Sequence, residues 1–321
     1  FFLYFIFVVY YSLIYLFFKN IKINKLIIIS VLSPLFILFP LAELEALGRK
    51  DILIPLFFLI YCNIFFKTNF LGLSIILLFC FPILLLTHEV SIFYLPFFLI
   101  LLLFKNEKFN TANFFTIFLI SIVFILIIYI LSNSPHSSDQ IKMMCDQIKN
   151  VLHDKCGLGA YVLNRGLDDN MDEFSVLSKT QIVRNLLILI IGFAAITILV
   201  QNSYFNNQKI NIISRYFNFK FIAFILFLPT LVPFIIAVDW GRWFNLSCTM
   251  ITLLYFFCYK NGKITLNSKI KIIEIFSSNF FRSKYFFLVI VFLLCFSWNP
   301  KAVYHEDIGS IPIYRIIAKM F

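Results

Sequence analysis

The stretch AVDWGRWFN at residues 237–245 places an acid and a base between two tryptophans, with long apolar runs on either side. If the stretch is helical, Asp239 and Arg242 lie three residues apart on one face and are able to pair. The Arg242 guanidinium, oriented by Asp239, would then suit a phosphate, to which it makes forked, charge-assisted hydrogen bonds. The alternative is a helix end that a salt bridge and its tryptophans anchor at a membrane surface.

The stretch GRKDILIPLFF at residues 48–58 presents the same choice. Arg49 and Lys50 precede an apolar helix that Asp51 is placed to cap. Positive side chains beside the free N–H groups of a helix start would attract an anion. The alternative is that both side chains snorkel to the membrane interface, balanced by Glu43 and Glu45.

A third polar site interrupts the apolar stretch 70–104, where His88 and Glu89 lie within THEVSIFYLPFF. Ionisable groups beside a membrane are costly and are typical of functional sites, and a histidine is able to act as a general base or acid near neutral pH. The alternative is a polar cap on a tight helical hairpin. No metal-ligand spacing surrounds these residues, so we expect neither a metal nor a cofactor. The remaining histidines are scattered at His136, His153 and His305.

The elements that must position these residues are membrane helices. The chain is 61% hydrophobic and only 13% charged, whereas soluble domains are about a quarter charged, and its apolar runs lack the alternation of a β-barrel. We therefore predict an all-α, polytopic transmembrane bundle in which residues 1–321 form a single integral membrane domain. About ten spans are expected, near 1–18, 26–42, 52–66, 70–86, 90–104, 113–132, 185–200, 221–238, 244–258 and 285–298.

The basic residues orient these spans. One set of alternate loops holds fifteen Lys and Arg residues, accompanied only by Glu107 and Glu274. Positive-inside bias places this set in the cytoplasm, so the net charge of +11 reports topology and predicts no nucleic-acid partner. The three polar sites then share the outer face, which we expect to be the working face. Because the chain opens with Phe rather than Met, we expect a fragment or a processed form, and at least eleven spans in the full protein.

The segment 133–184 is predicted to be a long outer, periplasmic loop. Apolar residues recur with helical spacing and predict an amphipathic helix near 139–153, at Ile141, Met144, Ile148, Val151 and Leu152. An oxidising outer compartment favours a disulfide between Cys145 and Cys156. A substrate-gripping lid and a plain connector both remain open for this loop.

The order of these features resembles the EpsG/Wzy-type polysaccharide polymerases. In that family an Arg followed by a polar residue opens one helix, and a His followed by a polar residue and Ser opens a later one. Arg49-Lys50 and His88-Glu89-Val90-Ser91 stand in those positions, so the resemblance covers residues 20–110. The departures are Lys50-Asp51, where a Gln or a similar residue is expected, and Glu89, where a basic residue is common. The DWGRW motif is not assigned to the family.

The resemblance implies a multi-pass glycosyltransferase of the bacterial inner (plasma) membrane, active in exopolysaccharide or O-antigen biosynthesis. It would join lipid-linked oligosaccharide repeats on the periplasmic face, with a polyprenyl-pyrophosphate-linked glycan as donor, membrane lipid around it, and polysaccharide export or chain-length machinery as further partners. Arg49 and Arg242, helped by Lys50, would bind the pyrophosphate. The base would be His88 or Glu89.

Glu89 and Asp239 would orient their partners in this scheme, and all six residues would have to converge in space. Two other functions stay open. Another multispanning, polyprenyl-dependent glycosyltransferase would use an acidic residue of the first outer loop, such as Glu43, Glu45 or Asp51. A transporter of lipid-linked glycans or other anions is disfavoured, because no internal repeat is visible and the charges gather at one interface.

Overall fold

The apolar runs fold into helices, so the predicted all-α class is confirmed. The structure, a computed structural model, describes residues 2–42, 49–105, 111–132, 138–152, 179–206, 217–236, 239–266, 284–298 and 300. The α-helices are α1 (Phe2–Phe18), α2 (Lys25–Val31), α3 (Leu38–Ala42), α5 (Leu53–Ile64), α6 (Phe70–Thr87), α7 (Leu95–Lys105), α8 (Thr111–Ser132), α9 (Ser138–Leu152), α12 (Lys179–Gln201), α14 (Phe219–Phe227), α15 (Val232–Ile236), α16 (Trp240–Lys260) and α19 (Lys284–Val291).

Shorter elements connect these helices. Three 3₁₀ turns precede α5, α7 and α15, at η1 (Lys50–Ile52), η2 (Glu89–Tyr94) and η4 (Pro229–Leu231). The π-helix η5 (Phe292–Phe296) continues α19. Strands β1 (Ser203–Phe205) and β2 (Ile264–Leu266) pair antiparallel, with Tyr204 opposite Thr265.

The expected spans 26–42 and 221–238 are interrupted in the structure. The run 26–42 divides into α2 and α3, and the run 221–238 divides into α14, η4 and α15. Prolines explain both breaks, because proline lacks an N–H donor and its ring clashes with the carbonyl of the preceding turn. Pro34 lies between α2 and α3, and Pro229 opens η4 with one residue between it and the end of α14.

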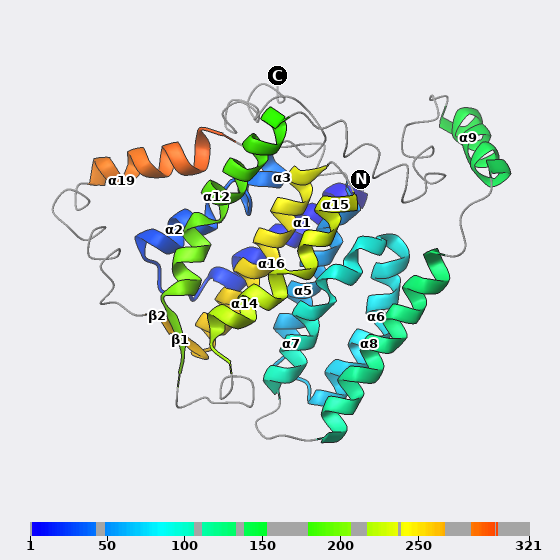
Figure 1. The fold of residues 1–321 in the computed structure, drawn as a ribbon, viewed down its shortest axis with the longest axis horizontal. Coiled ribbons are helices and arrows are strands. Elements are labelled where there is room, and N and C mark those ends of the chain that lie inside the picture. Colours follow the sequence, from blue (N-terminus) through cyan, green and yellow to red (C-terminus); the bar gives the residue numbers. More distant parts are fainter. Residues whose placement is uncertain are drawn as a thin grey trace.

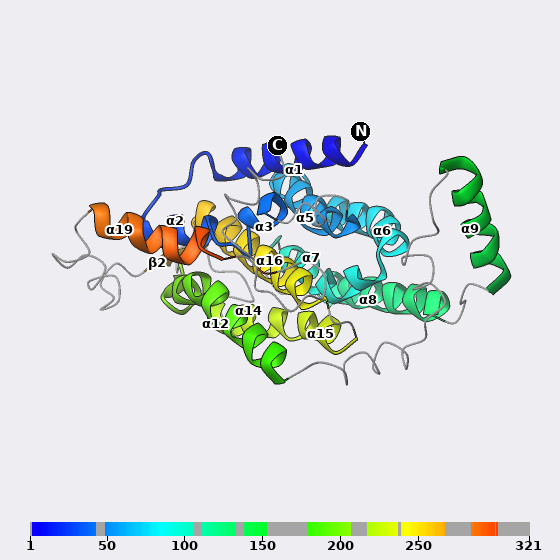
Figure 2. The same ribbon diagram turned by 90° about the horizontal axis from the view of Figure 1, so that it is seen from above.

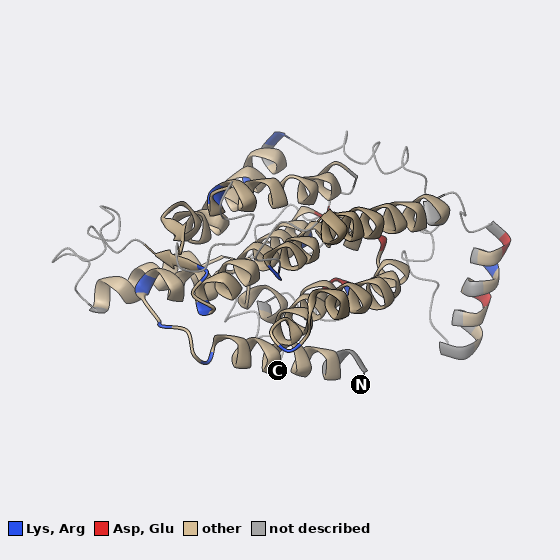
Figure 3. Ribbon diagram, turned by 90° about the horizontal axis from the view of Figure 1, so that it is seen from below, with Lys and Arg blue, Asp and Glu red and all other residues tan. Residues whose placement is uncertain are grey.

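Among the described residues, three helical segments are long and apolar enough to cross a membrane: Phe70–Thr87, Thr111–Ile130 and Gln181–Gln201. Shorter apolar helical stretches cover Phe5–Phe18, Phe219–Ile235 and Tyr285–Phe296. Helices α6 and α8 carry no charged residue along their length (Figure 3). These features associate the protein with a membrane.

The helices lie in layers around α16, which forms the centre of the fold (Figures 1 and 2). In Figure 2, α1 lies on one side, α5 and α6 follow, and α12 with α14 and α15 covers the opposite side. Nearly every residue of α16 from Trp243 to Cys258 is buried. The amide of Asn245 ties this helix to the segment before α3, donating to the Leu35 carbonyl over 3.0 Å.

Helices α5 and α16 run side by side in the same direction, which defines two ends of the bundle. At their starts Arg242 Nε donates to Asp51 Oδ2 over 2.7 Å, and near their ends the rings of Phe65 and Phe257 lie 5.0 Å apart. We call the first the cluster end. The second is the basic end, where Lys105, Lys260 and Lys263 each donate to a backbone carbonyl of another segment.

Helix α9 lies apart from the bundle in both views (Figures 1 and 2). Its residues match the helix that the apolar spacing predicts near 139–153. Cys145, within it, is disulfide-bonded, while Cys156 lies outside the described residues. The predicted outer loop ends earlier than 184, because α12 already begins at Lys179.

Gly192 allows α12 to approach the segment that joins α2 and α3. A Cβ atom there would lie 2.2 Å from Leu35 Cδ1 and 2.6 Å from Leu35 Cγ, and Leu35 is fully buried. A methyl group at residue 192 would overlap the Leu35 side chain, which is buried and has no free space to move into. We therefore expect Gly192→Ala to lower the free energy of unfolding by about 1–3 kcal/mol. Thermal unfolding in detergent micelles measures this loss.

The matched variant for this test is Leu35→Ala, alone and combined with Gly192→Ala. Leu35→Ala leaves a cavity and is itself destabilising. If the two side chains collide as the distances indicate, the double variant loses less stability than the two single losses together. Additive losses would contradict this close approach.

Candidate functional site

The Asp51 carboxylate joins three segments that are distant in sequence. Arg242 binds it in a bidentate manner through one edge of the guanidinium, with Nε donating to Oδ2 over 2.7 Å and Nη2 to Oδ1 over 2.8 Å. His88 Nε2 lies 2.6 Å from Oδ1. Asp51 is 8% exposed and His88 3%, so the contacts form within the protein at the cluster end.

Local structure places each of these side chains. Asp51 lies in η1, immediately before α5. His88 follows the last turn of α6 with an extended backbone, donates its N–H to the Leu84 carbonyl, and accepts from the Ser91 N–H. Arg242 lies in the first turn of α16.

Asp239 extends the cluster toward the surface. Arg242 Nη1 donates to Asp239 Oδ2 over 2.8 Å, which confirms the predicted pairing three residues apart. The same oxygen lies 3.5 Å from Arg49 Nη1, and the Arg49 side chain is 27% exposed. We call Arg49, Asp51, His88, Asp239 and Arg242 the polar cluster.

Lys50 and Glu89 form a looser pair beside the polar cluster. Lys50 Nζ lies 4.0 Å from Glu89 Oε2, and the two side chains are 52% and 70% exposed. Exposed pairs of this kind contribute about 0–1 kcal/mol. The pair therefore adds charge at the rim without fixing the fold.

Ionisation of Asp51 sets the proton arrangement of His88. Burial by itself raises the pKa of Asp51, but the hydrogen bonds from His88 and Arg242 and their charges lower it well below the ordinary value. An ionised carboxylate only accepts hydrogen bonds, so His88 Nε2 carries a proton and donates it to Asp51. In neutral His88 the lone pair is therefore on Nδ1.

Three buried polar atoms next to this arrangement have no hydrogen-bond partner within the described part of the chain: His88 Nδ1, Ser91 Oγ and Trp243 Nε1. The Trp243 ring lies 6.3 Å from the His88 ring and stacks 4.7 Å from the Arg242 guanidinium carbon. An unmet buried polar group costs about 1–3 kcal/mol. An acceptor, a hydroxyl and a donor are thus left without a partner in this part of the fold.

The polar cluster carries no surplus of positive charge when His88 is neutral. The two guanidinium groups face the Asp51 and Asp239 carboxylates, and Lys50 faces Glu89. Arg242 already donates three of the five N–H groups of an arginine. Arg49 has one contact at 3.5 Å and more exposure, so Arg49 is the arginine better able to exchange a carboxylate for another anion.

A small cavity adjoins the cluster on the side of α1. Its volume is about 20 Å³, and Tyr10, Asp51, Arg242 and Asn245 are among its lining residues. A cavity of this size holds about one water molecule. A sugar would therefore approach the cluster from the exposed side of Arg49 and Lys50, with some separation of the segments.

The structure brings together all six residues that the sequence predicts for the site, but it changes their connections. Asp51 does not cap a helix, because it lies within η1 and its carboxylate is bound by His88 and Arg242. Asp51 also takes the orienting role expected of Glu89, whose carboxylate lies beside Lys50 instead. The sequence feature that points to Asp51 is its position two residues after Arg49. From that position alone, Asp51 is expected to cap the helix that follows.

Other sequence predictions fall partly outside the described residues. Glu43 and Glu45 lie outside the described residues, as do residues 153–178 and residues 301–321. Within the described ranges, no group of three or more His, Cys, Asp or Glu side chains is placed to hold a metal ion. Cys62, Cys248, Cys258 and Cys295 are free and buried.

Known proteins do not assign this arrangement to a family. No protein-family model, no curated protein and no solved structure matches the chain.

Proposed function

We propose that this protein polymerises lipid-linked oligosaccharide repeat units at the periplasmic face of a bacterial inner membrane, through about ten membrane-spanning segments. The observation that carries the proposal is the convergence of Arg49, His88 and Asp239–Arg242 at one end of an apolar helical bundle. The basic end lies opposite, as positive-inside bias requires for an outward-facing cluster.

Arg49 and Lys50 are the groups suited to the pyrophosphate of a polyprenyl-linked donor. Their carboxylate partners are 3.5 Å and 4.0 Å away, and both side chains reach the exposed rim. Phosphate oxygens would replace these long contacts with shorter, charge-assisted ones. Arg242 supports the site by fixing Asp51 and Asp239, and Glu89 holds Lys50 at the rim.

His88 is suited to act as the general base. The acceptor hydroxyl oxygen would form the new bond to the anomeric carbon while its proton passes to His88 Nδ1. The bond from that carbon to the pyrophosphate oxygen breaks, and polyprenyl pyrophosphate leaves with the electron pair. The Ser91 hydroxyl and the Trp243 N–H, which are buried without partners in the described structure, would become available to the sugar if the segments separate.

The direct experiment uses the full chain in liposomes supplied with lipid-linked oligosaccharide extracted from membranes of the source bacterium. A ladder of products with two or more repeats, together with released polyprenyl pyrophosphate, is the expected result. Transfer of a single sugar without a ladder would indicate the other class of glycosyltransferase. Movement of the glycan across the bilayer without new bonds would indicate a transporter. Either result would overturn the proposal.

Arg49→Gln separates substrate binding from folding. Losing one charge-assisted contact of about 1.5–3 kcal/mol should raise the KM for the donor by roughly ten- to a hundredfold. The melting temperature should change little, because the Arg49–Asp239 pair is partly exposed and such pairs contribute about 0–1 kcal/mol. Lys67→Gln, an exposed charge at the basic end, serves as the control, and an unchanged KM in Arg49→Gln would exclude Arg49 from the donor site.

A further inference from the structure

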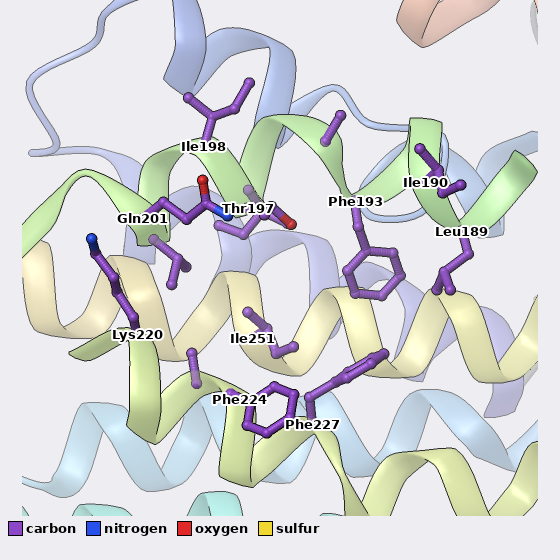
Figure 4. A pocket seen from close by; sticks show the side chains of 14 residues that line it. Leu189, Ile190, Phe193, Thr197, Ile198, Gln201, Lys220, Phe224, Phe227 and Ile251 are labelled. Carbon is purple, nitrogen blue, oxygen red and sulfur yellow. The ribbon is translucent and has the colours of Figure 1, made fainter. Parts of the chain in front are cut away.

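A second candidate site lies on the opposite side of α16 from α5. Helices α12 and α14 form the walls of an open groove of about 670 Å³, and Ile251 of α16 contributes to its floor (Figure 4). Ligand sites in proteins have volumes of about 300–1,000 Å³. The groove is therefore large enough for an elongated molecule.

The groove is apolar along most of its length and polar at one end. Figure 4 shows Gln201 and Lys220 together at that end, with Leu189, Phe193 and Phe227 toward the other. The Phe193 and Phe227 rings lie 5.6 Å apart and join the two walls. The arrangement matches an amphiphile with a polar head beside Lys220.

The extent of the groove matches one leaflet of a bilayer. From Leu189 to Gln201, a helix rises about 18 Å at 1.5 Å per residue. Half of the hydrocarbon thickness of a membrane is roughly 15 Å. The Gln181–Gln201 segment is long and apolar enough to cross a membrane, and the groove edges are exposed and apolar at Ile190 and Phe224.

Lys220 supplies charge complementarity. The lysines of the basic end, Lys105, Lys260 and Lys263, donate to backbone carbonyls. For Lys220 the structure shows instead a contact of 5.6 Å with the exposed Tyr204 ring. Its ammonium is therefore available to an anionic group at the polar end of the groove.

We propose that this groove binds an anionic phospholipid from the leaflet at the basic end, with one acyl chain between α12 and α14 and its phosphate beside Lys220. The site lies at the end of the bundle away from the polar cluster. It goes beyond the proposed polymerase function and does not depend on it.

Native mass spectrometry of the full chain in neutral detergent tests the proposal, with phosphatidylglycerol and phosphatidylcholine as probes. The wild type should retain one phosphatidylglycerol and bind it more tightly than phosphatidylcholine. Lys220→Gln should weaken phosphatidylglycerol binding about fivefold, the effect of one basic residue at an anionic surface. Lys67→Gln removes an exposed charge outside the groove and should leave binding unchanged.

A second pair of variants tests the groove without relying on charge. Ala194 lines the groove from an exposed position, so Ala194→Phe should fill it and reduce retention of the lipid at least tenfold. Leu187→Phe, at a half-exposed position of α12 outside the groove, should not. Equal binding of the two lipids, no effect of Lys220→Gln, or a second copy of the chain in place of the lipid would each overturn the assignment.

Discussion

Replacing Asp51 with asparagine is expected to lower the free energy of unfolding by about 3–5 kcal/mol, because it breaks a buried ion pair from one side. The Arg242 guanidinium would keep its charge with two of its three carboxylate hydrogen bonds weakened or lost. His88 Nε2 would lose its ionised acceptor at the same time. The variant weakens or removes contacts to two other segments at once.

Thermal unfolding followed with a thiol-reactive dye measures this loss in a Cys80→Ser background, since Cys80 is free and exposed whereas Cys62, Cys248 and Cys258 are free and buried. We expect the midpoint to fall on the order of 10 °C. Glu89→Gln, which changes a carboxylate that is 70% exposed, should lower stability by less than about 1 kcal/mol. A midpoint for Asp51→Asn close to that of the wild type would contradict the buried pair.

The double variant Asp51→Leu with Arg242→Met distinguishes a broken pair from a lost shape. Apolar residues of similar volume often replace a buried ion pair without loss. We therefore expect the double variant to recover more than half of the stability that Asp51→Asn loses. Its recovery would show that the penalty comes from an uncompensated charge.

The pH dependence of this stabilisation follows from the direction in which folding shifts the pKa of Asp51. The pKa of Asp51 is lowered in the folded protein, from an ordinary value of about 3.9. The contribution is fully present above that ordinary value, and it is lost as the pH falls through the lowered folded pKa. The cluster should therefore hold together across the neutral and mildly acidic range.

Local patterns in the sequence predict the helices and the pairing of Asp239 with Arg242, which depends on a spacing of three residues. They also place the three polar segments on one face, because alternate loops differ in charge. The central role of Asp51 is not visible in this way. Its bond to Arg242 spans 191 residues, and a single sequence carries no periodic signal for a contact of that separation.

Breaks within apolar runs and the groove at α12 escape prediction for related reasons. The hydropathy of 26–42 and 221–238 is continuous, so prolines alone mark the divisions that the structure shows. Residues 186–200 of α12 are almost entirely apolar, so the sequence does not distinguish the face that packs on α16 from the face that lines the groove. The packing of neighbouring helices decides which face of α12 is buried and which face lines the groove.

His88→Gln is expected to lower the rate of polymerisation by about 100- to 10,000-fold while preserving the fold, if the proposed function holds. The glutamine amide is able to donate to Asp51 in place of His88 Nε2–H, but it offers no nitrogen lone pair to accept a proton. A polymerisation assay at saturating donor, with thermal unfolding alongside, separates these effects. The expected pattern is a large fall in kcat with a nearly unchanged melting temperature.

The pH profile then decides what His88 does. A base must be unprotonated, so the wild-type rate should fall at acidic pH, where the base carries a proton. The residual rate of His88→Gln should lack this limb. If the variant retains most of the wild-type rate, His88 serves only as a donor that holds Asp51, and the unpaired His88 Nδ1 would have no catalytic role.

A rescue experiment provides a second readout if the rate and the melting temperature of His88→Gln fall together, because the histidine ring then fills space that glutamine does not. This experiment uses His88→Asn with added imidazole. Recovery of rate with imidazole, without recovery of the melting temperature, would identify the missing group as the base.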